Sequence, residues 1–520
     1  MNRPIRKLSI ALAVMLAAVF VNLNFVQVVK GDSYRNNPDN RRVLLNEYAS
    51  PRGQIVAQGT AIASSKQTTD ELKYLRVYEQ GPVYAPVTGY YSFVYGTSGI
   101  EQVENSVLTG DDPRLFGTQL TGLLTGRNAR AGSVELTLNP AAQQAAYAAM
   151  KANGKMRRGA VVALDPTTGA ILAAVSTPSY DPNKLSSHSQ ATVTQAWQAY
   201  QHDPADPMLN RALDQLYPPG SVFKVIDSAA ALKAGYKPDQ RIPAPNSYWP
   251  LEPKKTSACP ANHQGACVQN FNGETCDNGK TAALAFALAK SCNTAFAQLV
   301  VSKLGADRLA AEAKLFGFDS SSQLQVPLDV APSTIGSLNE LRNDDAALAQ
   351  SSFGQRSVAM TPLQGAMISA AVANNGSLMK PYLVARELGP TLSTLSRTQA
   401  TQLSQVIDPG LDQQLQSMME GVITSPEGTG GPANITDIPG VVVGGKTGTA
   451  DHGVPDKYGS QPPPHAWFSG FALQNGIPKI AVAVIIEDGG VNGNETTGGL
   501  AAGPVAKAVM EAYLKSGGGR

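Results

Sequence analysis

Two residues three positions apart, Ser221 and Lys224, could act as a nucleophile and its base. The Tyr-Pro-Pro-Gly run at 217–220 cannot continue a helix but can precede one, so we expect Ser221 at a helix N-terminus. Lys224 would then project from the same face, within reach of the hydroxyl. A lysine is a useful base only if its pKa is lowered, and a desolvated pocket that also held Lys446 would lower it. Because this spacing arises by chance about once or twice in a chain of this size, the pair alone is a weak signal.

A second pair of polar residues, Ser291 and Asn293, follows a helix that we expect at 281–290. Serine and asparagine are common in caps and turns, so a structural role is the simpler interpretation of this segment taken alone. In an active site, Ser291 could relay a proton to a leaving amine. The Asn293 amide could hold a substrate carbonyl.

Lys446-Thr447-Gly448-Thr449 ends an apolar strand that we expect at 441–445. Gly448 would let a substrate backbone lie flat against this edge, whereas a solvent-exposed lysine on an edge strand is the simpler alternative. The Lys-Thr-Gly triplet is expected by chance in only ~10% of chains this long. Its position after the other two segments makes coincidence improbable, and together the three predict a serine acyltransferase whose cationic strand holds a substrate carboxylate.

A Ser-His-Asp hydrolase is the alternative among serine enzymes, but the chain has five histidines and no Gly-x-Ser-x-Gly segment. His465 enters an expected strand and is better explained as structural. The other four have loop-like neighbours and no evident partner in the sequence: His188, His202, His263 and His452.

The elements that must position these residues alternate along the chain in a characteristic order. A strand pair is expected at 159–164 and 170–176, followed by a helical middle, three late strands and a last helix at 502–514. The expected middle helices and late strands are 282–290, 362–373, 441–445, 466–472 and 480–486. This order predicts an α+β domain in which distant parts of the chain complete an antiparallel sheet. Short strand-like segments at 43–130 predict a small, elongated domain without chemistry of its own.

The N-terminus has the pattern of a membrane anchor. Arg3, Arg6 and Lys7 precede an uncharged run of 22 residues, Leu8 to Val29. As a helix this run would be roughly 33 Å long, close to the ~30 Å hydrocarbon core of a bilayer. A cleaved signal peptide is the alternative, but the apolar run continues well past the weak cleavage site at 16–18. We therefore expect an uncleaved anchor, with the short leader inside the cell and the rest of the chain outside.

Four cysteines lie within one stretch of 34 residues: Cys259, Cys267, Cys276 and Cys292. An even number in an oxidising compartment predicts disulfides, and of three possible connectivities we expect each cysteine to pair with its nearest neighbour. A zinc site with His263 is the alternative, although no Cys-x-x-Cys spacing is present. The second disulfide would staple the loop that carries Ser291 and Asn293.

Length and composition set broad limits. The chain of 520 residues suggests two compact units with connecting segments. With 42% hydrophobic residues, 16% charged residues and a net charge of +2, the chain is typical of folded proteins. No polybasic field indicates a nucleic-acid partner.

The three motifs resemble those of the penicillin-binding proteins and serine β-lactamases. Further segments are similar to the monofunctional class B penicillin-binding proteins, in particular to actinobacterial members of comparable length. These segments are Ser50-Pro-Arg-Gly-Gln-Ile, Tyr95-Gly-Thr-Ser-Gly-Ile-Glu, Leu136-Thr-Leu-Asn-Pro, residues 159–169, Asn210-Arg-Ala, Gly354-Gln and Ala359-Met-Thr-Pro-Leu-Gln. The likeness covers nearly the whole chain. One departure is Cys292, in the middle of the Ser-x-Asn element.

The resemblance implies the fold class and its domains. We expect a cytoplasmic leader at 1–7, a transmembrane helix at 8–29, and a stalk with a small pedestal domain of the dimerisation type at 30–155. A penicillin-binding transpeptidase domain, with an antiparallel sheet and helices on both sides, is expected at 156–520.

The resemblance also implies D,D-transpeptidation of peptidoglycan stem peptides through a serine acyl-enzyme, with β-lactams as inhibitors. The implied roles are Ser221 as nucleophile, Lys224 as base, Ser291 as proton relay, Asn293 as the group that orients the substrate amide, Lys446 as the source of positive potential, and Thr447 and Thr449 as the carboxylate site beside Gly448. The backbone N–H groups of Ser221 and Thr449 would form the oxyanion hole. No metal or cofactor is expected.

The implied partners are the membrane, a lipid II polymerase and other division or elongation proteins. Hydrolytic relatives, a D,D-carboxypeptidase or a β-lactamase, share the acylation step. The anchor, the N-terminal domain and the 155 residues between Ser291 and Lys446 disfavour a β-lactamase. A penicillin sensor or scaffold without turnover is a further alternative.

Overall fold

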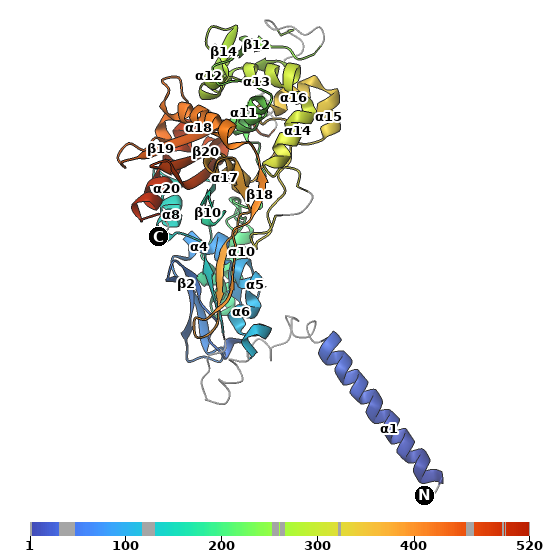
Figure 1. Cartoon of the computed structure of the whole chain (residues 1–520). Helices are drawn as coiled ribbons and strands as arrows, with labels where there is room; N and C mark the ends of the chain where they lie inside the picture. The colour runs from blue at the N-terminus through green and yellow to red at the C-terminus, as the bar shows by residue number, and fades with distance from the viewer. Residues whose placement is uncertain are drawn as a thin grey trace.

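The computed structural model describes residues 3–30, 47–116, 131–251, 259–260, 266–320, 324–453, 462–490, 493 and 496–518. The expected stalk and His263 lie outside these residues. Helix α1 (Arg3–Asn24) extends away from the rest of the chain (Figure 1). With the π-turn that follows it, this apolar helix runs over Arg3–Gln27 with no buried residue, and by length and composition it could cross a membrane.

A five-stranded antiparallel sheet forms the centre of the larger domain, in the order β10-β9-β21-β20-β19. The strands are β9 (Gly159–Leu164), β10 (Ile171–Thr177), β19 (Val441–Ala450), β20 (His465–Gln474) and β21 (Ile477–Ile486). Strands from the two ends of the domain therefore complete one sheet, which confirms the predicted α+β architecture.

Helices cover both faces of this sheet, as the alternation along β21 shows. Ala481, Ala483 and Ile485 belong to one core cluster, and Val482 and Val484 to the other. On the first face lies α17 (Pro362–Ala373), which is buried along its whole length; on the second lie α8 (Pro140–Ala149) and α20 (Gly503–Lys515). Successive side chains on a strand point to opposite faces of the sheet, so they pack into separate cores.

A helical subdomain packs around α11 (Lys224–Lys233) at one end of the molecule (Figure 1). Its other helices are α12 (Leu284–Ala289), α13 (Asn293–Leu299), α14 (Gly305–Leu315), α15 (Leu338–Asn343), α16 (Asp345–Ser351) and α18 (Pro409–Thr424). The helix expected at 281–290 begins later than predicted. Residues Thr281–Ala283 instead form strand β14, because they pair with β11 (Arg241–Pro243).

The smaller domain contains a six-stranded sheet in the order β17-β16-β6-β1-β2-β3. Its strands are β1 (Ile55–Ala57), β2 (Thr60–Gln67), β3 (Tyr74–Tyr78), β6 (Ser133–Leu136), β16 (Val384–Leu388) and β17 (Thr394–Arg397). The last two strands come from deep within the region 156–520, so the chain returns to the pedestal after building much of the larger domain.

Candidate active site

Ser221 lies in a tight turn against the edge strand β19. The 3₁₀ turn Gly220–Phe223 leads directly into α11, close to the expected helix N-terminus. Gly220 has φ +54°, and a Cβ there would lie 2.7 Å from the carbonyl oxygen of Thr449. Only glycine fits such a close approach in this backbone conformation. Ser221 is thereby held at the wall of a cavity of about 640 Å³.

The side chain of Lys224 is completely buried beside the Ser291–Asn293 segment. Its Nζ donates hydrogen bonds to Ser291 O (2.7 Å) and Asn293 Oδ1 (2.7 Å), and Ser291 Oγ lies 3.3 Å from it. Within the described part of the chain it makes no direct hydrogen bond to Ser221. Ser291 itself has φ +66°, a left-handed conformation that serine rarely adopts, between the end of α12 and the start of α13.

Lys446 is also completely buried, and it reaches the same serine from β19. Its Nζ donates to Ser291 Oγ (2.9 Å) and to Thr447 O (2.9 Å). The Ser291 hydroxyl therefore lies between two amines, one from the helix that follows the nucleophile and one from the edge strand. This arrangement provides a path for a proton.

Burial determines the charge of the two lysines. It lowers the pKa of Lys446 to about 7. Burial also lowers the pKa of Lys224 well below its ordinary value; the positive charge of Lys446 adds to this effect, and the buried Asp227 opposes it. Two ammonium groups around one hydroxyl in a dry site are unfavourable, so Lys224 is the amine that stays neutral and can accept a proton.

The four residues of the Lys-Thr-Gly-Thr segment lie inside β19, which extends to Ala450 rather than ending near 445. Thr447 and Thr449 line the cavity together with Ser221 and Ser291. Gly448 also permits a close approach within the protein itself. A Cβ at this position would lie 2.7 Å from Pro219 O, so the close approach it permits is that of the nucleophile's own turn.

The cavity also includes residues that were not assigned a role in the site from the sequence. Six of them are Asn270, Phe271, Glu274, Gln355, Thr429 and Thr497. All but Phe271, which begins the 3₁₀ turn Phe271–Gly273, belong to connections between elements, where side-chain direction follows from tertiary contacts. Only Gln355 stood in a segment that the family resemblance had singled out.

Two disulfides join Cys259 to Cys267 and Cys276 to Cys292. None of the four thiols is left free for a zinc site. Cys292 directly precedes α13, so the second disulfide fixes one wall of the cavity covalently. The Asn293 amide donates to Gln269 O (2.9 Å) and strengthens the same wall.

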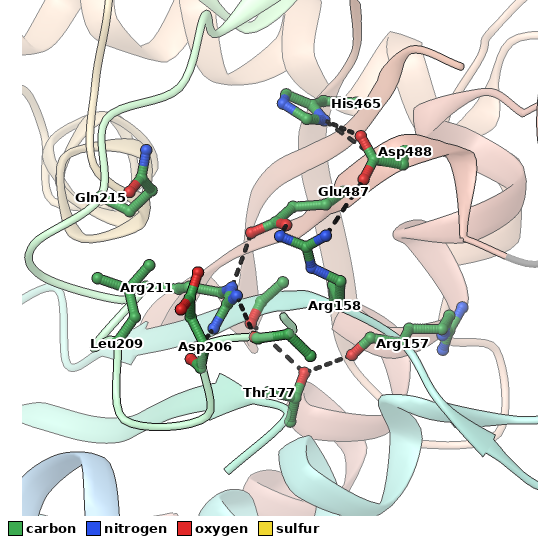
Figure 2. Close-up of polar contacts among 12 residues, drawn as sticks. Arg157, Arg158, Thr177, Asp206, Leu209, Arg211, Gln215, His465, Glu487 and Asp488 are labelled. Carbon is green, nitrogen blue, oxygen red and sulfur yellow. Dashed lines mark hydrogen bonds and ion pairs between the residues drawn. The ribbon is translucent and has the colours of Figure 1, made fainter. Parts of the chain in front are cut away.

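An ionic cluster around the buried residues Arg211 and Glu487 holds the segment that precedes the nucleophile (Figure 2). Arg211, which is fully buried, donates to Glu487 Oε1 (2.8 Å), and Arg158 lies 3.0 Å from Glu487 Oε2. The Tyr217 hydroxyl donates to the same Glu487 oxygen (2.6 Å), and Trp467 Nε1 donates to Pro218 O (3.0 Å). The end of β21 is thereby tied to the residues just before Ser221.

Three of the histidines that the structure describes, His188, His452 and His465, pair with aspartates or with one another. His465 Nδ1 accepts a hydrogen bond from the Asp488 backbone (3.2 Å), and burial lowers the pKa of His465 to about 4. His452 stacks on His465 with ring centroids 3.7 Å apart and contacts Asp488. His188 pairs with Asp70 (2.8 Å). The sequence had suggested no partner for His452 or His188.

Known proteins are similar to this chain in both of its domains. Residues 159–511 match the penicillin binding protein transpeptidase domain, and residues 52–134 match the penicillin binding protein A dimerisation domain. The peptidoglycan D,D-transpeptidase PbpA of Mycolicibacterium smegmatis is 44% identical, with 99% of this chain and 100% of the relative covered. PbpA of Mycobacterium tuberculosis H37Rv is 42% identical over 99% of each chain.

Solved structures agree with these relatives. The ceftriaxone acyl-enzyme complex of penicillin-binding protein A from M. tuberculosis superposes with a TM-score of 0.82 at 43% identity, covering 91% of this chain and 100% of that one. The crystal structure of PBPA from the same organism gives a TM-score of 0.80 at 42% identity, covering 90% and 100%. The chain thus belongs to the class B penicillin-binding protein transpeptidases.

Proposed function

We propose that this protein is a peptidoglycan D,D-transpeptidase that acts through an acyl-enzyme on Ser221 and is a target of β-lactams. The observation that supports this most is the row Lys224–Ser291–Lys446 beside the cavity that Ser221 and Ser291 line. It combines a neutral amine, a shared hydroxyl and a cation in a desolvated site. Similarity to PbpA over the whole chain adds to this support.

Acylation begins when Ser221 Oγ attacks the carbonyl carbon between two terminal D-alanines of a stem peptide. The hydroxyl proton passes to the neutral amine of Lys224 as the C–O bond forms. The oxyanion is stabilised by the backbone N–H groups of Ser221 and Thr449. When the C–N bond breaks, the leaving nitrogen takes a proton from Ser291 Oγ, and Lys224 returns one to Ser291.

The second step reverses this proton flow. An amine of a neighbouring stem peptide attacks the ester, loses its proton along the same path, and displaces Ser221, whose oxygen is reprotonated. Asn293 orients the substrate amide, and Thr447 and Thr449 bind the terminal carboxylate. Lys446 supplies positive potential, and an arriving carboxylate raises the fraction of Lys446 that is charged.

The apolar helix α1 and the basic residues before it favour a single membrane anchor, with the catalytic domain on the extracytoplasmic side. The pedestal, proposed to span 30–155 together with the stalk and completed by strands β16 and β17, would hold the catalytic domain built from the rest of 156–520 away from the bilayer. A lipid II polymerase and other division or elongation proteins are the partners proposed for this topology.

The full-length protein in detergent micelles provides the test. With a fluorescent penicillin, a stable adduct on Ser221 is expected in the wild type and none in Ser221→Ala. Ser189→Ala, which changes the cap of the distant helix α10 (Gln190–Gln201), serves as a matched control and should label normally. A label on another residue would refute the site assignment.

Turnover separates the related functions. A donor peptide ending in D-Ala-D-Ala, supplied with an acceptor stem peptide, should give a cross-linked product and free D-alanine. Release of D-alanine without cross-linking would identify a carboxypeptidase. Rapid hydrolysis of the penicillin adduct would identify a β-lactamase, and a stable adduct with no peptide turnover would identify a sensor.

A further inference from the structure

Thr429 joins two walls of the cavity that no local motif connects. It lies in the connection after α18, and its Oγ1 is 2.6 Å from Thr447 Oγ1 on β19. Its backbone N–H donates to Ala289 O (3.3 Å), the last residue of α12 and two positions before Ser291. Thr429 also lines the cavity. One residue therefore contacts both the strand of the carboxylate site and the helix that leads to the proton relay.

The backbone of Thr429 is fixed from the other side as well. Gly499 approaches so closely that a Cβ there would lie 2.2 Å from Thr429 O. Two residues earlier, Glu427 forms an ion pair with Lys290 (2.7 Å), which ties the same connection to the end of α12. The Thr429 hydroxyl is consequently presented to Thr447 by a held backbone.

The direction of the hydrogen bond between the two hydroxyls decides what Thr447 can do. Each hydroxyl has one proton to donate and lone pairs to accept. The other acceptor near Thr429 Oγ1 is Ala289 O at 3.5 Å, a distance at which a hydrogen bond is weak. With the ligand carboxylate bound at Thr447, as the proposed function has it, both protons have good acceptors when Thr429 donates to Thr447 and Thr447 donates to the carboxylate. Such a chain strengthens the terminal donor.

We propose that Thr429 is a positioning residue: by donating a hydrogen bond to Thr447, it leaves the Thr447 proton free to be donated to the ligand, so that the site selects ligands with a free carboxylate. This inference rests on the proposed function, because it assigns a partner to the carboxylate site of that reaction. It predicts a defect in recognition of the carboxylate rather than in the chemistry at Ser221.

The substitution Thr429→Val tests this by removing the hydroxyl at almost constant shape, with the backbone bond to Ala289 kept. In the full-length protein, benzylpenicillin should show an apparent dissociation constant raised about tenfold, with the maximal acylation rate changed less than about twofold. Thr429→Ser should restore binding. Acylation by the methyl ester of benzylpenicillin, which lacks the carboxylate, should be the same in wild type and Thr429→Val.

A double mutant shows whether Thr429 acts through Thr447. The combination Thr429→Val/Thr447→Val should bind benzylpenicillin no worse than Thr447→Val alone, because the effect of Thr429 has no other route. Thr424→Val, at the exposed end of α18, is the matched control and should equal the wild type.

Additive losses in the double mutant, or an equal loss for the ester and the free acid, would overturn this inference while leaving the proposed function intact. Absence of any acylation in the wild type would overturn the proposed function, and this inference with it.

Discussion

Replacing Lys446 by methionine should make the protein more stable and inactive. Burial lowers the pKa of this lysine from an ordinary 10.5 to about 7. Holding its ammonium in the folded state therefore costs about 5 kcal/mol at low pH. Methionine has a similar length and no charge. It also gives up two hydrogen bonds, to Ser291 Oγ and Thr447 O, worth about 1 kcal/mol each. The expected net gain is about 3 kcal/mol.

This gain should depend on pH in a defined direction. Because the folded-state pKa is lower than that of the unfolded chain, the folded protein binds fewer protons between pH 7 and 10.5. The cost in the wild type is complete below pH 7 and disappears as the pH rises to 10.5. Near pH 9.5 the remaining cost of burying Lys446 is about 1.5 kcal/mol. This no longer exceeds the free energy of the two hydrogen bonds that methionine gives up.

Thermal unfolding at pH 6 and pH 9.5 measures both effects. Lys446→Met should unfold about 6 °C above the wild type at pH 6 and at nearly the same temperature at pH 9.5. Fluorescent penicillin should fail to label the variant, because the cation and the donor to Ser291 are gone. Lys237→Met, at an exposed loop lysine, should show no such pH-dependent difference.

A variant less stable than the wild type at pH 6, or a difference that is constant with pH, would refute the reasoning. Either result would mean that the buried ammonium has a compensating partner and that its pKa is not lowered. Lys446 would then be fully charged at neutral pH. Burial alone would no longer account for a neutral Lys224 beside it.

Three further predictions concern the residues around the site. Changing Cys276 and Cys292 to serine opens a link between residues 16 positions apart and should lower the free energy of unfolding, measured with urea, by about 3 kcal/mol and slow acylation. Burial lowers the pKa of His465 to about 4, so the wild type loses about 3 kcal/mol of unfolding free energy as the pH falls from 6.5 to 4. His465→Gln should abolish this loss, which melting curves across the same pH range would show. Glu487→Gln leaves the charge of Arg211 buried without its partner and should lower the free energy of unfolding by about 3 kcal/mol. Adding Arg211→Met to this variant should recover part of the loss, as measured by calorimetry.

The motif residues of the site could be found in the sequence because their chemistry is encoded in short spacings. A serine and a lysine three positions apart near a helix start are expected on one face; the structure places Lys224 beside the Ser291 segment, with no direct hydrogen bond to Ser221 among the described residues. Thr429 could not be found in this way. Its role comes from the packing of a connection against β19, 18 residues away in sequence, and no periodicity encodes such a contact.

The fold was predictable to a similar depth. The order of strands and helices predicted the central antiparallel sheet, since each strand is a short apolar run bounded by turn residues, which marks it independently of its partner. It did not predict that Thr281–Ala283 pair with Arg241–Pro243, because an apolar segment this short fits a helix as well as a strand. Nor did it predict that β16 and β17 join the pedestal, because the sequence pattern of a strand does not indicate which sheet the strand will join.

The return of the chain to the pedestal has a consequence for biosynthesis. Strand β6 pairs with β16, and Glu135 on β6 accepts a hydrogen bond from Arg386 on β16, 251 residues later. At about 5–20 residues per second, the ribosome needs roughly 12–50 s to make this interval. During this time β6 presents an open edge, the feature through which sheets aggregate. A nascent chain that stalls before residue 384 therefore carries an unfinished pedestal with this edge of β6 unpaired, before the catalytic strand β19 has been made.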